Sequence, residues 1–272
     1  MAESASMSTE RPAKLGLLQH TYPIVAVLIT LAVWEAAVRV FKVPELILPA
    51  PSVVFHHIWT KRELYIAFSQ PTLIEILAGF AVAAVAGIGL GILVSFSELA
   101  RRTAYPLLVS SQMVPKVAIA PVFIIWFGTG LQAKVLISFL IAFFPIMVST
   151  MVGLEAIEAD MVRLFRSMGA GAYRTFIKLR LPAALPNIFA GLKIGMSLAV
   201  VGAVVAEFVA ADRGLGYYLL YANGQLDTPG VFGALLVLTV IGVVLYYIVE
   251  AVERMFVPSA LSKDIDPAQS SM

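Results

Sequence analysis

The side chains best placed to do chemistry in this sequence are a few ionisable groups inside apolar stretches. Lys116 lies between Pro115 and Pro121, and Glu207 comes near the end of a long apolar run, just before the turn sequence DRGLG. A charge inside a bilayer is costly, so such a residue is by default a candidate for function. Lys116 could contact an anionic substrate, or it could pair with an acid such as Glu75 or Glu207. For Glu207 we expect a structural role in capping a gate.

Enzymatic chemistry has little support in the sequence. The 272 residues include no cysteine, which excludes disulfides, thiolate metal sites and cysteine nucleophiles. The three histidines (His20, His56 and His57) do not stand in a metal-binding spacing. The chain has no GxxxxGK[ST] loop to cradle a nucleotide, no paired carboxylates at helical spacing inside the apolar runs, and no nucleic-acid-binding module. We therefore expect no metal or other cofactor and no nucleic-acid partner.

The elements that position these groups are predicted to be membrane-spanning helices. Apolar residues make up 60% of the chain and charged residues 13%, and the mean hydropathy is +0.91. The apolar residues are gathered in blocks, and a helix needs about 20 of them to cross a bilayer. We predict an all-α membrane protein with six spans: Tyr22–Phe41, Pro71–Phe96, Pro106–Phe127, Val135–Leu154, Ile188–Val209 and Val231–Val249.

The distribution of lysine and arginine predicts the orientation of these spans. With an even number of spans, both termini and the loops 97–105 and 155–187 share one side, which carries eleven cations against six on the other. Cations are retained in the cytoplasm, so both termini are expected there. Residues 1–20 and 257–272 are expected to be cytoplasmic tails, of which 1–12 and 263–272 are disordered. Residues 21–256 are expected to form the membrane-spanning domain. The first span is interpreted as an uncleaved anchor, because it contains Trp34 and Glu35 and lacks a convincing cleavage site.

Glycine pairs within the predicted spans indicate close helix packing. Gly87 and Gly91, and likewise Gly191 and Gly195, have the spacing that lets two membrane helices approach closely. Packing within the chain is favoured over a seam between two copies.

The most basic segment, GAGAYRTFIKLRLPAALPNIFAGLK (169–193), follows a group of acidic residues. On a helical wheel, residues 163–178 divide into an apolar arc that includes Phe165, Met168 and Phe176, and an opposite basic arc that includes Arg163. The glycines favour two short helices hinged at GAG over one long helix. The segment could rest on anionic lipid headgroups, or it could dock an apolar ridge into a groove of a cytoplasmic partner.

The spacing within this segment identifies a family resemblance. Gly169, Leu179, Leu181 and Pro182 match the frame G-x9-[IL]-x-L-P, which resembles the cytoplasmic loop of permease subunits of bacterial ABC importers. The stretches ILPAPSVVF (47–55), VPKVAIAPVFIIWFGTG (114–130) and AEFVAADRGLGYYL (206–219) are similar to the branch that serves sulfonates, taurine and nitrate. Thiamine-precursor, riboflavin and aromatic-acid permeases look similar too. The resemblance covers about residues 20–256.

The resemblance implies a type I importer permease in the bacterial inner membrane, paired with a second copy or a close relative. Two copies of a cytoplasmic ATPase would bind ATP and receive the coupling loops, and an extracytoplasmic binding protein would deliver a small solute, with an anion favoured. The implied coupling residues are Arg163, Phe165, Met168, Gly169, Ala170, Phe176, Leu179, Leu181 and Pro182. In the family the loop often opens with Glu-Ala-Ala, whereas this chain has Arg-Leu-Phe (163–165). Pro182 is expected to fix where the next segment starts, and Leu181 to pack in the base of the loop.

The translocation pathway is expected to include Gln112, Met113, Lys116, Met196, Ser197 and Glu207. Lys193 is expected to extend to the cytoplasmic interface, and the aromatic stretch 212–230 to form either a binding-protein contact or an interfacial belt. The alternative function is a self-sufficient secondary carrier or channel. Such carriers tend to have inverted repeats, and no clear internal duplication is present here.

Overall fold

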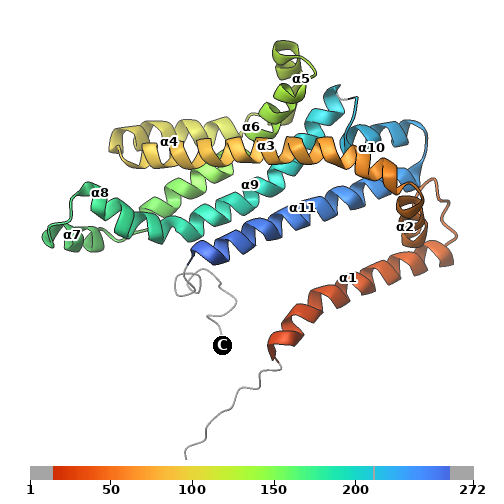
Figure 1. Cartoon of the computed structure of the whole chain (residues 1–272), viewed down its shortest axis with the longest axis horizontal. Helices are drawn as coiled ribbons and strands as arrows, with labels where there is room; N and C mark the ends of the chain where they lie inside the picture. Colours follow the sequence, from red (N-terminus) through yellow and green to blue (C-terminus); the bar gives the residue numbers. More distant parts are fainter. Residues whose placement is uncertain (1–14, 211, 258–272) are drawn as a thin grey trace, which may run out of the picture.

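The structure is a computed structural model, and it describes residues 15–210 and 212–257. Within those ranges the chain is built of helices joined by short turns (Figure 1). The predicted disordered tails, residues 1–12 and 263–272, lie outside the described residues.

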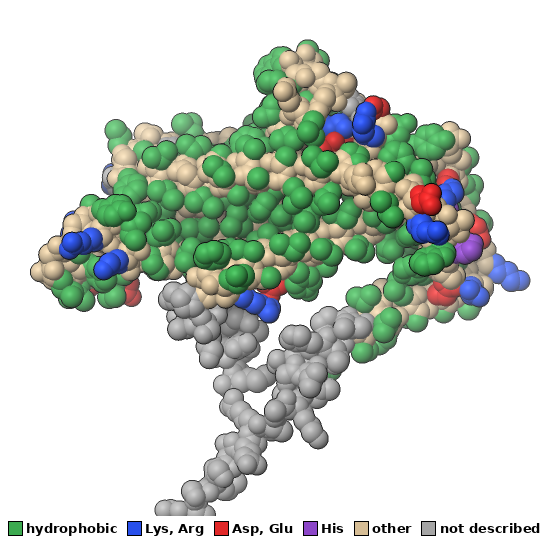
Figure 2. Space-filling model, viewed as in Figure 1, with side chains coloured by type: hydrophobic (Ala, Val, Ile, Leu, Met, Phe, Trp, Pro, Cys, Tyr) green, Lys and Arg blue, Asp and Glu red, His purple; other side chains and the backbone are tan. Residues whose placement is uncertain are grey.

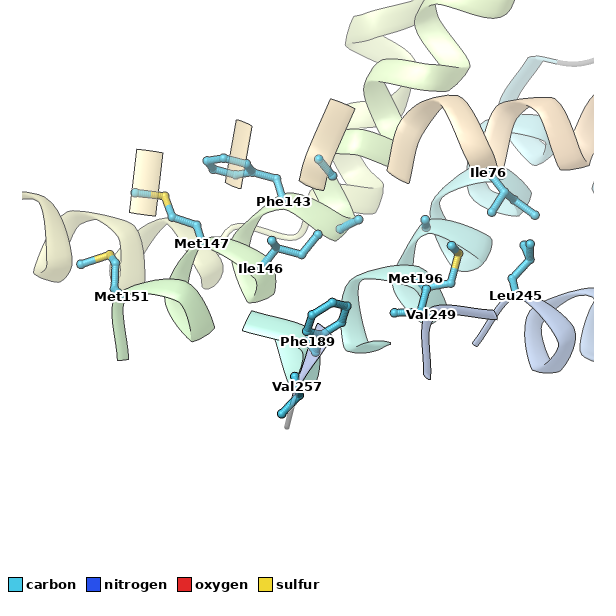
Figure 3. Close-up of a cluster of buried hydrophobic side chains, with 14 residues drawn as sticks. Ile76, Phe143, Ile146, Met147, Met151, Phe189, Met196, Leu245, Val249 and Val257 are labelled. Carbon is cyan, nitrogen blue, oxygen red and sulfur yellow. The ribbon is translucent and has the colours of Figure 1, made fainter. Parts of the chain in front are cut away.

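Four long helices form the body of the molecule: α3 (Arg62–Ser95), α6 (Leu131–Glu155), α9 (Leu181–Ala210) and α11 (Thr228–Phe256). Within the described residues, four helical segments are long and apolar enough to cross a membrane, and the third of them extends from Ala172 to Val209. They coincide with the second, fourth, fifth and sixth predicted spans. Their shared core joins Ile76 of α3, Ile146 of α6, Met196 of α9 and Leu245 of α11 (Figure 3).

Helix α6 is the centre of this bundle because glycines let α3 and α9 approach it closely. A Cβ atom on Gly91 of α3 would lie 2.8 Å from Cβ of Thr150, and one on Gly195 of α9 would lie 2.6 Å from Cδ1 of Ile146. Contacts this short are overlaps, so neither position accepts a larger residue without a shift. The prediction that these glycine pairs pack within the chain is confirmed.

The third predicted span, residues 106–127, is not one helix. Helix α4 (Glu98–Gln112) ends before Pro115, and α5 (Lys116–Phe127) begins after it and leaves the bundle (Figure 1). Proline cannot donate a backbone hydrogen bond and disfavours helical geometry in the residue before it, which explains the break. The prediction of one continuous spanning helix here is therefore wrong, and α5 has only 12 residues.

Helix α1 (Leu15–Val40) covers the first predicted span but runs away from the bundle along most of its length (Figure 1). It is held near its C-terminal end, where Glu35 Oε1 accepts a hydrogen bond of 2.8 Å from Ser52 Oγ in α2 (Pro51–Thr60). Close by, the rings of Trp34 and Phe232 have centroids 5.7 Å apart. Glu35 thus makes its polar contacts with α2 beside Trp34.

Short helices occupy the two ends of the bundle. At one end, here called the α7 end, lie α7 (Ala159–Ser167), α8 (Ala172–Thr175) and a π-helical turn, η1 (Phe176–Arg180). At the other, here called the α10 end, lie α2 and α10 (Leu215–Gly224) (Figure 1).

Helix α9 begins at Leu181, one residue before Pro182, in agreement with the expectation that this proline marks where the next segment starts, but no break precedes it. Helix α8, η1 and α9 follow one another without a gap, so one helical run leads from Ala172 into the bundle. A proline inside a helix removes one hydrogen bond and crowds the carbonyl four residues earlier, here that of Lys178. The π-helical turn includes Lys178, and its wider backbone hydrogen-bonding pattern makes room for the proline ring there.

Candidate functional site

The turn between α7 and α8 has the geometry of a helix-terminating glycine motif. Gly169 has φ of +80°, and its N–H donates to the carbonyl of Arg166 at 3.0 Å. The N–H of Ala170 donates to the carbonyl of Phe165, also at 3.0 Å. These two bonds define a Schellman motif, in which glycine takes the left-handed conformation at no steric cost. The prediction of two short helices hinged at GAG is confirmed.

The surface of this turn is both apolar and basic. Leu164, Met168 and Tyr173 are exposed, with Tyr173 at 78% of its full accessibility. Arg163 pairs with Asp160 at 2.5 Å, and Arg166, Arg174 and Lys178 add further positive charge. Figure 2 shows cationic side chains on the surface at this end of the molecule. An exposed apolar ridge bordered by cations is suited to docking on another surface.

The base of the same segment is fixed to the bundle. The ring of Phe176 lies 5.0 Å from that of Phe96, the residue that follows α3. Phe176 and Leu181 also pack on the buried side chains of Leu154 and Ile188. The prediction that Leu181 packs in the base of the loop is confirmed, and the segment touches α3, α6 and α9 at once.

The remaining predicted coupling residues lie around this turn. Arg163 and Met168 are exposed, whereas Phe165, Ala170, Leu179 and Pro182 are half-buried. They share one end of the molecule, and the structure carries them on a single helix–turn–helix segment.

The predicted pathway residues are not brought together. Met196 is buried in the bundle core, Glu207 is buried at the α10 end, and Met113 and Ser197 are exposed. Gln112 ends α4, and its side chain lies outside the described part of the chain. The structure therefore does not gather these six residues into one site.

Among the residues that the structure describes, Lys116 has no acidic partner. Its Nζ lies 4.5 Å from the ring centroid of Phe144, a cation–π geometry. Glu75 and Glu207 bind other groups at the α10 end, so the predicted pairing with either of them is wrong. Lys193 forms an ion pair of 2.7 Å with Glu253, a contact between α9 and α11 that the sequence did not indicate.

A buried polar cluster lies at the α10 end, and the sequence had indicated only its two acids, Glu75 and Glu207. Lys134 Nζ donates to Glu75 Oε1 at 2.8 Å, and Thr72 Oγ1 donates to Glu207 Oε1 at 2.6 Å. All four residues are at most 5% exposed. We refer to these four residues as the polar cluster. Lys134 was missed because it directly precedes an apolar run, and Thr72 because a lone threonine gives no signal in sequence.

The polar cluster holds the start of α10 in place. The N–H of Leu215 donates to Thr72 Oγ1 at 2.8 Å, and the N–H of Gly216 donates to Glu207 Oε2 at 2.5 Å. Gly214 has φ of +117°, and a Cβ atom there would overlap the Glu207 carboxylate. The sequence DRGLG thus folds onto Glu207, consistent with the structural capping role expected for this residue.

A second polar group at the α10 end joins α2 to the start of α11. His57 Nδ1 lies 2.9 Å from Tyr65 Oη, and His57 Nε2 lies 3.2 Å from Asp227 Oδ2, while Lys61 Nζ approaches the same oxygen at 3.3 Å. Burial lowers the pKa of His57 below its ordinary value of 6.5, although Asp227 opposes this. Burial would raise the pKa of Asp227, but the N–H of Gly230 and Lys61 outweigh it, and the pKa is lowered.

A cavity of about 680 Å³ opens beside the polar cluster. It is lined by Pro71, Ile74, Glu75, Thr129, Gly130, Leu131, Lys134, Asp212 and Arg213. In the described part of the chain, no three His, Asp or Glu side chains come together as a metal site.

The family model of the binding-protein-dependent transport system inner membrane component matches residues 83–260. The chain belongs to this family. Full-length relatives agree: a formylaminopyrimidine transport permease protein of Halalkalibacterium halodurans is 36% identical over 241 residues, which are 88% of this chain and 96% of the relative. A riboflavin transport system permease protein of Chloroflexus aurantiacus is 35% identical over 94% of this chain and 98% of its own. A taurine transport system permease protein of Escherichia coli is 30% identical over 88% of this chain and 90% of its own length.

This family membership confirms the resemblance carried by Gly169, Leu179, Leu181 and Pro182. The chain is a permease subunit of an ABC importer, and ATP hydrolysis belongs to a separate subunit. The alternative of a self-sufficient secondary carrier is thereby set aside. A binding-protein-dependent system also implies a solute-binding protein and an ATPase as partners.

Proposed function

We propose that this permease lines the membrane pathway for a small solute and that the segment 155–187 is the coupling loop through which a cytoplasmic ATPase dimer drives it. The observation that carries the proposal is the Schellman turn at Gly169. It projects an exposed apolar and basic ridge from a base that is packed against α3, α6 and α9.

The topology we propose keeps six spans, with α4 and α5 together making the third. The α7 end then faces the cytoplasm, as do both termini, and the α10 end faces outward in the bacterial inner membrane. The cations over α7 and α8 support this orientation, because positive charge is retained on the cytoplasmic side. The break at Pro115 is compatible with a span, because interrupted membrane helices are tolerated where they line a cavity or are buried in protein.

We further propose that two copies of the chain enclose the pathway and that an extracytoplasmic binding protein docks on the α10 end. Met113 and Lys116 lie at the break between α4 and α5, where Pro115, which has no N–H, interrupts the helix. The proposed cargo is a small organic or inorganic solute, with a sulfonate, taurine, nitrate or aromatic acid favoured. The relatives named for taurine and for aliphatic sulfonates support that range.

In this proposal the coupling loop works as a rigid lever. Because α8, η1 and α9 are one helical run, a displacement of the docked ridge moves the membrane helix that contains Glu207. The Phe96–Phe176 contact passes the same displacement to α3. Packed interfaces of this kind shift between discrete arrangements rather than deform smoothly.

The proposal is tested by purifying the tagged protein from its native membranes in mild detergent and identifying co-purifying subunits. We expect an ATPase to accompany the wild-type chain and to be lost from Gly169→Asp, because the left-handed conformation disfavours any side chain. The matched control is Gly171→Asp. Gly171 has φ of −68° and begins α8, a position that accepts aspartate well. If both variants retained the ATPase, the docking role of this turn would be wrong.

A further inference from the structure

The cavity beside the polar cluster has the size and chemistry of a small-molecule site. Its volume of about 680 Å³ lies within the range of about 300–1,000 Å³ that is usual for ligand pockets. Its wall includes the buried pair Glu75 and Lys134, and Asp212 and Arg213 stand near its edge, paired with each other at 3.3 Å. The cavity thus joins a polar interior to an exposed rim.

The polar cluster has one more acid than base. Glu75 and Glu207 supply two carboxylates, and their side chains lie close enough to interact with each other. Lys134 is the one cation among the four residues. Both oxygens of Glu207 accept hydrogen bonds, from Thr72 and from the N–H of Gly216. Both oxygens of Glu207 are therefore occupied, and the oxygen of the two carboxylates that is left to accept a donor belongs to Glu75.

The second oxygen of Glu75 is left without a partner. Oε1 accepts from Lys134, whereas Oε2 is buried and has no hydrogen-bond partner within the described chain. Burying a carboxylate oxygen without a donor is costly, because the group loses its hydration and gains nothing in return. A positively charged hydrogen-bond donor at Oε2 would satisfy the oxygen and balance the cluster in one step.

We propose that Glu75 is the subsite for a protonated nitrogen of the transported solute, such as an ammonium or amidinium group, which enters this cavity and binds Oε2 when the buried carboxyl group turns toward the cavity. The inference rests on the proposed function, since it assumes that the α10 end opens to solute. Lys134 remains paired with Oε1, so the Glu75 carboxylate can bind only one further cationic group. Arg213, at 70% side-chain exposure, is free to exchange Asp212 for an anionic end of the same solute. A solute carrying both charges would therefore suit this cavity best.

The test uses the purified full-length chain in lipid nanodiscs, with guanidinium as the probe and tetramethylammonium as its control. Both carry one positive charge, but only guanidinium has N–H donors. Dicyclohexylcarbodiimide, which reacts with protonated carboxyl groups in apolar surroundings, labels Glu75, and peptide mass spectrometry follows the rate. We expect guanidinium to halve that rate at a concentration about tenfold below that of tetramethylammonium, as expected for one hydrogen bond to a charged group.

Two variants sharpen the result. Lys134→Gln removes the competing cation and should lower the guanidinium concentration needed for protection. Glu63→Gln changes an exposed acid on the same helix and should leave protection as in the wild type. Equal protection by both cations, or none by either, would show that the site holds only a proton and would overturn the proposal. If Glu75 does not react in the wild type because Lys134 keeps it ionised, Lys134→Gln supplies the reactive carboxyl for the same comparison of the two cations. None of these results depends on ATPase co-purification, so the inference and the proposed function can fail separately.

Discussion

The ring of Phe176, in the π-helical turn, lies 5.0 Å from the ring of Phe96 at the end of α3, with the planes tilted by 45°. This contact ties the basic loop to a helix other than the one that it continues. It gives the loop two mechanical connections to the bundle, one along the chain and one through space.

Replacement of Phe176 by alanine should weaken coupling more than assembly. The ring is half-buried, so we expect a loss of about 2 kcal/mol in the free energy of unfolding. The ATPase should still co-purify, but solute uptake per ATP hydrolysed in proteoliposomes should fall several-fold. Phe176→Leu, which keeps most of the apolar volume, is the control. Unchanged uptake per ATP in the alanine variant would mean that the contact between Phe96 and Phe176 takes no part in coupling.

Replacement of Thr72 by valine should release α10. The hydroxyl donates to Glu207 and accepts from the N–H of Leu215, so its loss leaves two buried polar groups unpaired. We expect a loss of about 3 kcal/mol, since each buried unsatisfied group costs about 1–3 kcal/mol. Hydrogen exchange should show faster exchange of the Leu215 amide, while Thr72→Ser should resemble the wild type. Slow exchange in the valine variant would contradict the role given to this hydroxyl.

Two glycines on α3 should respond oppositely to alanine. A Cβ atom at Gly91 would lie 2.8 Å from Cβ of Thr150, so Gly91→Ala should cost about 1–3 kcal/mol through overpacking. At Gly89 a Cβ atom would meet nothing within 4 Å, and Gly89→Ala should gain up to about 1 kcal/mol in helix propensity. Thermal unfolding in detergent measures both. A destabilised Gly89→Ala would show that this face is covered by another chain.

The burial of His57 should make stability depend on pH. Because the pKa of His57 is lowered in the folded state, the unfolded chain binds a proton first as the pH falls. Stability should therefore be full above the ordinary histidine pKa of 6.5 and decline as the pH drops below it. Asp227, whose pKa is also lowered, adds a separate loss below about pH 4.

Melting temperatures at pH 7.5 and 5.5 test this dependence. His57→Asn should remove the difference between the two pH values, and the exposed neighbour His56→Asn should keep it. A wild-type protein that is equally stable at both pH values would show that His57 does not make stability depend on pH.

The sequence was sufficient for features that depend on local pattern. Apolar blocks predicted α3, α6, α9 and α11, because apolar blocks of that length are typical of membrane-spanning helices. The hinge at Gly169 followed from the low helix propensity of two glycines close together. The broken third span was missed because hydropathy does not register that Pro115 interrupts a ladder of hydrogen bonds.

Features that depend on tertiary contact could not be predicted. Glu75 and Lys134 are 59 residues apart, and their pairing follows from how α3 and α6 pack, which the glycines decide. Lys116 does not meet Glu75 because it contacts α6 at Phe144, ten residues along the helix from Lys134, which itself pairs with Glu75. The register of Leu181 and Pro182 was foreseen as a boundary, whereas the helix accommodates the proline by widening.

The π-helical turn before Pro182 has a geometric consequence for the whole importer. A π-turn is in effect one extra residue inserted in an α-helix, and one residue corresponds to a rotation of about 100° and a rise of about 1.5 Å. The docking ridge and the bundle-facing side of α9 are therefore out of phase by that angle. The single added residue decides which way the ridge points, and with it the direction from which a partner must push.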